Sequence, residues 1–196
     1  GPWAGHIPFA YWIVNALKPN SIVELGTFRG NSYFNLCHAV QIFGLKSRAF
    51  AIDTWEGDQH GGFYGEHIYR EVNTYNQKNF LSFSTLIRST FDDALDRFDS
   101  KSIDLLHIDG YHTYEAVKND FKKWKPKLSN RGVVLLHDIS VIENNFGVWK
   151  FFEELKHQYP CFWFNHSNGL GIVMVGTDIP DELRSLDALI SVSYTH

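Results

Sequence analysis

The stretch LLHIDGYHTYEAV, residues 105–117, places three side chains that can do chemistry within six positions of one another. They are His107, Asp109 and His112, and they come directly after an apolar run. Imidazole and carboxylate groups at this spacing can bind a metal ion or exchange protons with a substrate. They can also be no more than the polar end of a buried strand. Which of these holds depends on the elements that position the three side chains.

Short β-like runs alternate with helical stretches, which predicts a parallel sheet with helices on both faces. The expected strands are residues 21–25, 48–53, 83–89, 102–109 and 132–138, and the clearest expected helices are residues 91–98, 113–124 and 147–159. Residues 161–176 are typical of two strands joined by a Ser-Asn-Gly turn, hence an antiparallel hairpin. We therefore expect an α/β, Rossmann-like, mostly parallel sheet of seven strands with a C-terminal antiparallel hairpin.

The composition disfavours several classes of protein. A chain of 196 residues with 44% hydrophobic and 20% charged residues is ordinary for one globular domain. A formal net charge of -4 without a Lys/Arg stripe disfavours a nucleic-acid partner. Only Cys37 and Cys161 are present, far apart, which predicts a reduced, cytoplasmic protein. No apolar run is long enough for a membrane span.

The domain is expected to cover residues 3–176. Gly1-Pro2 is typical of the remnant of a cleaved tag, and residues 177–196 are expected to be a C-terminal extension, either a peripheral helix or the start of a truncated segment. The Gly- and Tyr-rich composition of residues 54–79 predicts a loop or lid followed by a helix. Lid side chains that could contact a substrate are Asp58, His60, Tyr64 and Tyr69. The oligomeric state is left open.

The first expected strand runs into VELGTFRGNS, residues 23–32, where Gly26 and Gly30 let the backbone approach a ligand closely. The helix that follows can hold an anionic group at its N-terminus. Asp53 ends the second strand, where an acid can accept hydrogen bonds from ribose hydroxyls. Glycines also mark any tight strand-to-helix turn, but together with Asp53 they predict a nucleoside cofactor, either a nicotinamide dinucleotide or S-adenosylmethionine (SAM).

Three features favour SAM over a nicotinamide cofactor. The chain has no G-x-G-x-x-G motif, and Glu24 stands just before the glycine turn, where a dinucleotide fold usually has an apolar residue. The expected C-terminal hairpin also matches the seven-stranded sheet of methyltransferases.

Five segments in order, VELGTFRGNS, AIDTWEGD, LLHIDGYHTYEAVKNDFKKWKPKL, GVVLLHDI and GLGIVMVG, resemble a class I SAM-dependent methyltransferase. More narrowly they resemble methyltransferase family 24, small-molecule O-methyltransferases that occur alone or attached to glycosyltransferases and are distantly similar to catechol O-methyltransferases. The resemblance implies an enzyme that methylates a hydroxyl of a sugar or glycoconjugate. The alternatives are a phenolic or other secondary-metabolite acceptor, and a non-catalytic SAM-binding module beside a glycosyltransferase.

The resemblance also implies roles for single residues. The cofactor-binding set is Glu24, Gly26, Thr27, Gly30, Ser32, Asp53, Trp55, Ser89 and Asp109. In this set Asp53 would hold the ribose and Ser89 would lie near the adenine. Trp55 would cover the adenine or the pocket mouth, or would only pack in the lid, and Ser32 would bind the SAM carboxylate or only start the helix.

In the related catechol and sugar O-methyltransferases, acids at the ends of the fourth and fifth strands bind a divalent cation. The matching residues here are Asp109, His137 and Asp138. The carboxylates suit Mg²⁺, whereas the imidazole suits Mn²⁺ better. Ile139 replaces the amide of the catechol enzymes, which puts the cation in question. Either this cation or a histidine would activate the acceptor hydroxyl.

The resemblance also changes the expected base. His112 stands where the catechol enzymes have a lysine, and a histidine with its ordinary pKa near 6.5 suits proton abstraction. The expected catalytic residues are therefore His112 and Asp109. His107 is expected to be a buried structural residue bonded to the backbone or to a neighbouring acid, and Asp120 is expected to be a helix-surface or capping group.

Overall fold

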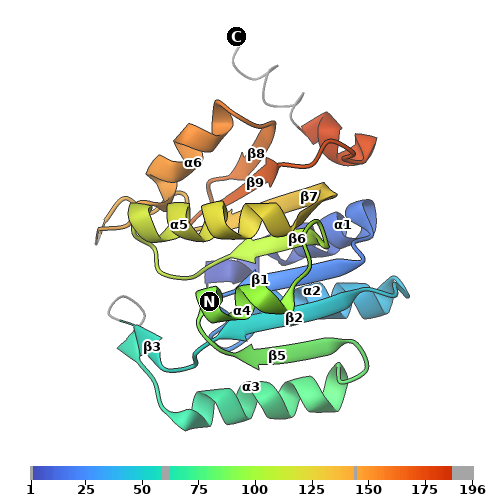
Figure 1. Ribbon diagram of the computed structural model, residues 1–196, viewed down its shortest axis with the longest axis vertical. Coiled ribbons are helices and arrows are strands. Elements are labelled where there is room, and N and C mark those ends of the chain that lie inside the picture. Colours follow the sequence, from blue (N-terminus) through green and yellow to red (C-terminus); the bar gives the residue numbers. More distant parts are fainter. Residues whose placement is uncertain (1, 59–61, 144, 187–196) are drawn as a thin grey trace.

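The main sheet of the protein has seven strands (Figure 1). The computed structural model describes residues 2–58, 62–143 and 145–186. The strands of the main sheet are β1 (Ser21–Leu25), β2 (Arg48–Asp53), β5 (Ser84–Arg88), β6 (Ile103–Ile108), β7 (Leu128–His137), β8 (Cys161–Phe164) and β9 (Leu170–Met174). Their order is β5-β2-β1-β6-β7-β9-β8, with β9 antiparallel to both of its neighbours and the other pairs parallel. The expected Rossmann-like sheet and its C-terminal hairpin are confirmed.

Helices cover both faces of the sheet, because both faces of its inner strands are apolar and must be buried. One face packs against α1 (Ile7–Leu17), α2 (Asn31–Ile42) and α3 (Glu66–Asn79). The other packs against α4 (Phe91–Ala94), α5 (Tyr114–Trp124) and α6 (Val148–Lys156), which lie in front of the sheet in Figure 1. The short elements are η1 (Pro2–His6), η2 (Leu95–Arg97), η3 (Lys125–Lys127), β3 (Gly57–Asp58) and β4 (Gly62–Phe63).

The structure differs from the sequence-based expectation in three places. The helix expected over residues 91–98 is split into α4 and η2, after which Phe98 turns inward and packs edge-on against Trp124. Strand β7 begins at Leu128, four residues before the expected start at Gly132, because Leu128 pairs with Ile103. Asp120 is buried, with 8% of its surface exposed, so its expected position on a helix surface is wrong. In the C-terminal extension residues 181–186 are helical, and residues 187–196 lie outside the described residues.

The order of the strands reverses between β1 and β6. The chain passes from β1 to β2 and β5 on one side, then crosses to β6 and β7 on the other. Ligands of open parallel sheets bind beyond the carboxyl ends of the strands at such a reversal. Gly26 lies at this point with a φ of 86°, and a Cβ there would come within 2.1 Å of the carbonyl oxygen of Asp109. Only glycine therefore lets the loop after β1 pass so close to the end of β6.

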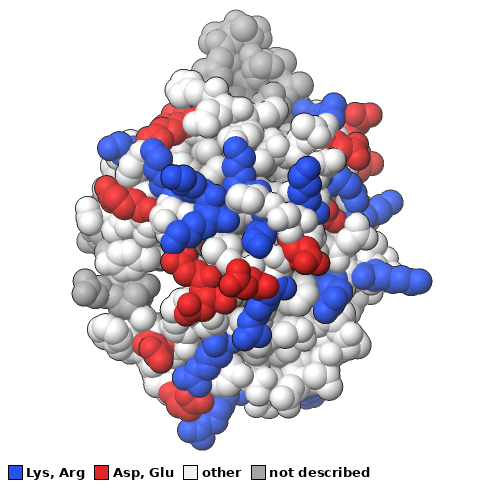
Figure 2. All heavy atoms as spheres, viewed as in Figure 1, with Lys and Arg blue, Asp and Glu red and all other residues white. Residues whose placement is uncertain are grey.

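The outer face of α4 and α5 carries charges of both signs. Basic side chains gather over α5 beside a group of acidic ones (Figure 2), and Lys123 pairs with Asp92 at 2.6 Å. Among the described residues, the structure has no helix that is both long and apolar enough to cross a membrane.

Candidate active site

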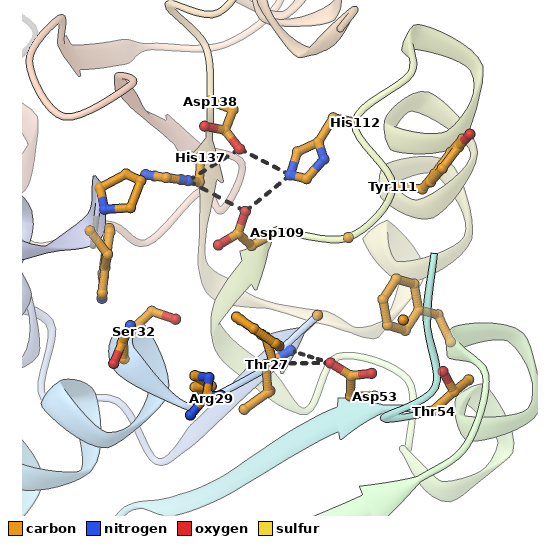
Figure 3. A pocket seen from close by; sticks show the side chains of 18 of the residues that line it. Thr27, Arg29, Ser32, Asp53, Thr54, Asp109, Tyr111, His112, His137 and Asp138 are labelled. Carbon is orange, nitrogen blue, oxygen red and sulfur yellow. Dashed lines mark hydrogen bonds and ion pairs between the residues drawn. The ribbon is translucent and has the colours of Figure 1, made fainter. Parts of the chain in front are cut away.

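A cavity of about 450 Å³ lies at the reversal point, a volume typical of small-molecule sites. The residues that the sequence predicts for the site and that line this cavity are Gly26, Thr27, Ser32, Asp53, Asp109, His112, His137 and Asp138. They come from the ends of β1, β2, β6 and β7 and from the start of α2, as Figure 3 shows for most of them. Segments that are far apart in the sequence therefore meet at one edge of the sheet.

The wall formed by β1 and α2 presents polar groups to the cavity. Thr27 is buried and lines the cavity, and its hydroxyl has no hydrogen-bond partner within the described part of the chain. Ser32 lines the cavity from the first turn of α2, where backbone N–H groups and the helix dipole favour a carboxylate. This donor set fits the amino-acid part of SAM.

Asp53 is already held by the backbone around it. One carboxylate oxygen accepts hydrogen bonds from the N–H groups of Thr27 and Phe28 at 2.9 and 2.8 Å, and the other accepts from Trp55 at 2.7 Å. A carboxylate has roughly four acceptor positions, so Asp53 keeps capacity for one further donor. These bonds fix its carboxylate on the cavity wall, where a ribose role stays a prediction.

Four residues of the predicted cofactor-binding set do not line the cavity. Trp55 is 1% exposed, packs against Tyr69 and donates its indole N–H to the carbonyl of Phe28 at 2.8 Å. Trp55 therefore does not line the cavity in which it was expected to cover the adenine or the mouth of the pocket. Ser89 does not line the cavity, whereas its neighbours Thr90 and Phe91 do. Glu24 is fully buried behind it, and Gly30 borders a neighbouring groove.

Glu24 and His107 form a pair in the interior of the sheet. They are direct register partners on β1 and β6, and His107 Nδ1 lies 2.7 Å from a Glu24 carboxylate oxygen. Both side chains are 0% exposed. Burial raises the pKa of Glu24, and the hydrogen bond to His107 opposes this shift. His107 is thus a structural residue bonded to a neighbouring acid, as expected from the sequence.

The lid residues predicted from the sequence lie in different places in the structure. Tyr64 lines the cavity, whereas Tyr69 packs against Trp55. Asp58 belongs to the short strand β3, and His60 lies outside the described residues.

Two carboxylates and two imidazoles converge on the opposite wall (Figure 3). Nε2 of His112 lies 2.9 Å from Asp138 Oδ2 and 3.5 Å from Asp109 Oδ1. Nδ1 of His137 lies 3.4 Å from each of the same two oxygens. We call these four residues the acid–histidine cluster. Adjacent strands β6 and β7 end here, so the convergence expected for Asp109, His137 and Asp138 is confirmed.

The charges of the acid–histidine cluster balance. Burial alone would lower the pKa of both histidines, but the two carboxylates raise it to about 9 for His112 and to about 10 for His137. In return, although burial opposes this shift, the histidines hold the pKa of Asp109 well below its usual value and that of Asp138 at about 2. At neutral pH two imidazolium charges therefore face two carboxylate charges. The expectation that His112 keeps its ordinary pKa is wrong.

The geometry around His137 also fits a divalent cation. One ligand atom from each of Asp109, His137 and Asp138 lies within 4.8 Å of the others, as ligands of one ion do. The second ring nitrogen of His137 lies 3.2 Å from the carbonyl oxygen of Ser167, to which it can donate. Histidines that bind metals usually donate their other N–H to such an acceptor, which fixes the ring. A mixed nitrogen and oxygen set suits Mn²⁺, Fe²⁺ or Zn²⁺ better than Mg²⁺.

Sequence reasoning missed several residues of the cavity wall. Trp3, Phe28, Tyr111 and Asn168 line the cavity from the N-terminal segment and from loops. The loops after β1 and β6 follow strand ends that the sequence identifies, so Phe28 and Tyr111 could have been found. Trp3 and Asn168 lie far apart in the sequence, and no periodic pattern points to them.

A family model described as a methyltransferase domain matches residues 23–139. The chain belongs to this methyltransferase domain family. The methyltransferase domain is also 50% identical over 184 residues to the uncharacterized protein y4gI of Sinorhizobium fredii, covering 94% of this chain. It spans only 20% of the length of that relative.

Solved structures share the fold of the methyltransferase domain at low sequence identity. TomG of Streptomyces achromogenes, an O-methyltransferase involved in tomaymycin synthesis and solved with SAM, has a TM-score of 0.63 at 14% identity, covering 88% of this chain and 80% of its own. A Staphylococcus aureus protein with a provisional assignment as a caffeoyl-CoA O-methyltransferase has a TM-score of 0.67 at 17% identity, covering 85% and 80%. The family and the sheet together make the chain a class I SAM-dependent methyltransferase domain.

Proposed function

We propose that the methyltransferase domain transfers a methyl group from SAM to a hydroxyl of a sugar or glycoconjugate. The observation that carries the transfer to an oxygen is the acid–histidine cluster, which lines the same cavity as the predicted cofactor residues. Charged groups that can hold and deprotonate a hydroxyl thus share one site with the residues predicted to bind the methyl donor. A sugar acceptor, and an association with a glycosyltransferase, rest on the resemblance to family 24. The much longer relative supports a role inside a larger protein.

Methyl transfer is an in-line displacement in which the acceptor oxygen attacks the methyl carbon and the sulfonium sulfur leaves. The protein must therefore align three atoms and accept one proton. Thr27, Ser32 and Asp53 would hold the cofactor on the wall formed by β1 and α2. Asp109, His137 and Asp138 would hold a divalent cation, which supplies positive charge that lowers the pKa of the acceptor hydroxyl. His112 would take the hydroxyl proton in its neutral form, which a cation held by the same carboxylates would favour by lowering the pKa of the imidazole, so that its proton is released to solvent.

A phenolic hydroxyl is the second candidate acceptor. Aromatic side chains on the cavity wall, Tyr64, Phe91 and Tyr111, favour a flat aromatic ligand as well as an adenine.

Methyl transfer from labelled SAM to a panel of oligosaccharides, glycoconjugates and phenols tests the proposal. We expect transfer to members of the sugar group, and preference for the phenols would replace the sugar acceptor by the second candidate. SAM binding without transfer to any acceptor would favour a non-catalytic binding module. Nicotinamide binding without SAM binding would contradict the cofactor.

Variants of the acid–histidine cluster test its role. We expect His112→Gln to lower kcat by about 10²–10⁴-fold, the usual contribution of a general base. Asp138→Asn should lower it as well, because one carboxylate of the cluster is lost. Asp96→Asn, an exposed change of the same kind on η2, should leave kcat unchanged. Equal activity of His112→Gln and wild type would remove the proposed base.

Chelation tests the cation. Exhaustive EDTA treatment should abolish transfer, and Mn²⁺ should restore it. Unchanged activity after EDTA, in protein that metal analysis finds free of metal, would show that the cation is not used.

A further inference from the structure

The turn between β8 and β9 supports the end of β7 through the backbone. The antiparallel β7–β9 pairing continues past His137 and Leu170, since the N–H of Asp138 donates to the carbonyl of Gly169 at 3.1 Å. The N–H of Ser140 then donates to the carbonyl of Asn168 at 2.9 Å. These bonds hold the turn directly beside the acid–histidine cluster.

Two side chains of the cluster are bonded to this turn. His137 faces the carbonyl of Ser167, as described above, and the amide of Asn168 donates to Asp138 Oδ1 at 2.9 Å. The other oxygen of Asp138, Oδ2, faces His112 and His137. Asn168 is exposed as a whole residue, but the carboxylate that it bonds is only 8% exposed. The amide of Asn168 therefore bonds one oxygen of Asp138 while the other points into the cluster.

The backbone of Asp138 makes such support necessary. Asp138 has a φ of 63°, in the left-handed region that is unfavourable for residues other than glycine, although Asp and Asn tolerate it best. Strain of this kind persists only where surrounding bonds impose it, and it is common at functional sites. Asn168 itself has a φ of 67°.

We infer that Asn168 is a positioning residue that holds the Asp138 carboxylate in its orientation toward His112 and His137. The catechol-like pattern has an amide directly after the acid of the fifth strand, where this chain has Ile139. Here an amide reaches the acid from another element, the β8–β9 turn. The consequence for cation binding rests on the proposed function, whereas the orientation of the carboxylate does not.

Asn168→Asp tests the inference, because it keeps the size and tolerance of a positive φ but replaces the donor by a repelling carboxylate. Asn145→Asp is a matched control, since Asn145 is an exposed residue of a nearby loop with a φ of 63°. Asn168→Gly removes the amide without backbone strain and serves if Asn168→Asp does not fold. For each protein we would determine a crystal structure and measure SAM affinity by calorimetry and Mn²⁺ affinity by electron paramagnetic resonance.

In Asn168→Asp and Asn168→Gly we expect the Asp138 carboxylate to turn away, so that its oxygens lie beyond roughly 3.5 Å from His112 Nε2 and no longer accept a hydrogen bond. Mn²⁺ affinity should fall by about 10–100-fold, as for other residues that orient metal ligands, with SAM affinity within about twofold of wild type. An unmoved carboxylate in both Asn168 variants, or equal movement in Asn145→Asp, would overturn the inference. If wild type binds no Mn²⁺, the proposed cation fails and the crystal structures alone decide the role of Asn168.

Discussion

At the scale of single residues, the Glu24–His107 pair makes stability depend on one buried hydrogen bond. Glu24→Ala would leave the fully buried imidazole without its partner, which typically costs about 1–3 kcal/mol of the free energy of unfolding. Glu24→Gln keeps an acceptor for His107 Nδ1 and should cost clearly less. Urea unfolding followed by circular dichroism measures both changes.

The matched control for this prediction is Glu71→Ala. Glu71 pairs with Arg29 at 3.0 Å on the surface, where both side chains are about half exposed, so its loss should cost under about 1 kcal/mol. Equal losses in Glu24→Ala and Glu71→Ala would show that the buried pair is no more important than a surface one.

Single residues also show how far the sequence predicts the candidate site. Asp109, His137 and Asp138 follow from strand ends, because neighbouring parallel strands finish at the same edge of a sheet. Asn168 could not be predicted, since its contact depends on the geometry of a turn that the sequence places but does not orient. Trp55 packs against Tyr69 and does not line the cavity, and nothing in the spacing of a loop tells whether an indole faces a ligand or the core.

At the scale of elements, helix α5 carries a buried acid that should make stability depend on pH. Burial, together with the charge of Asp92, raises the pKa of Asp120 from 3.8 to about 6. Because the folded state holds this proton more tightly, the protonated acid adds no penalty below pH 4, and the folded state loses stability as the pH rises toward 6. Asp120→Asn should therefore match wild type at pH 4 and be more stable above pH 6.

The expected gain is about 3 kcal/mol, from a shift of about two pH units at ~1.4 kcal/mol each. Chemical denaturation of both proteins from pH 4 to 8 measures it, with Glu115→Gln, an exposed change on the same helix, as the control. A difference between Asp120→Asn and wild type that does not vary with pH would contradict the assignment.

The elements themselves were largely predictable, because alternation of apolar runs and helical stretches identifies each strand of the main sheet. The wrong predictions concern where single helices and strands begin or end, and which face of a helix is buried. Asp120 looked exposed because the sequence of α5 is rich in charge, yet its position falls on the buried side, four residues before Trp124 and three after Val117. The helical repeat of Val117 and Trp124 therefore predicts a buried Asp120, in spite of the charge-rich sequence around it.

At the scale of the whole molecule, the N-terminal segment and the β8–β9 turn meet at the site. His6 Nε2 lies 3.1 Å from the carbonyl of Ser167, the same carbonyl that faces His137. Trp3 stacks on His107 with ring centres 5.1 Å apart and meets His137 edge-on at 5.7 Å. The N-terminal segment thus connects β6, β7 and the β8–β9 turn, and its packing should matter for both folding and cofactor binding.

Trp3→Ala tests this connection. Trp3 is 4% exposed and lines the cavity, so its truncation should cost about 3–5 kcal/mol in the free energy of unfolding and weaken SAM binding. Trp3→Phe keeps an aromatic ring and removes an indole N–H that is buried without a partner in the described part of the chain, so it should cost much less.

Trp12→Ala is the matched control for Trp3→Ala. At a position 37% exposed on α1, it removes the same side chain far from the cluster contacts and should leave SAM affinity unchanged. Urea unfolding and calorimetry with SAM separate the two effects. If Trp3→Ala and Trp12→Ala lose the same stability and bind SAM equally well, the N-terminal segment packs on the site without supporting it.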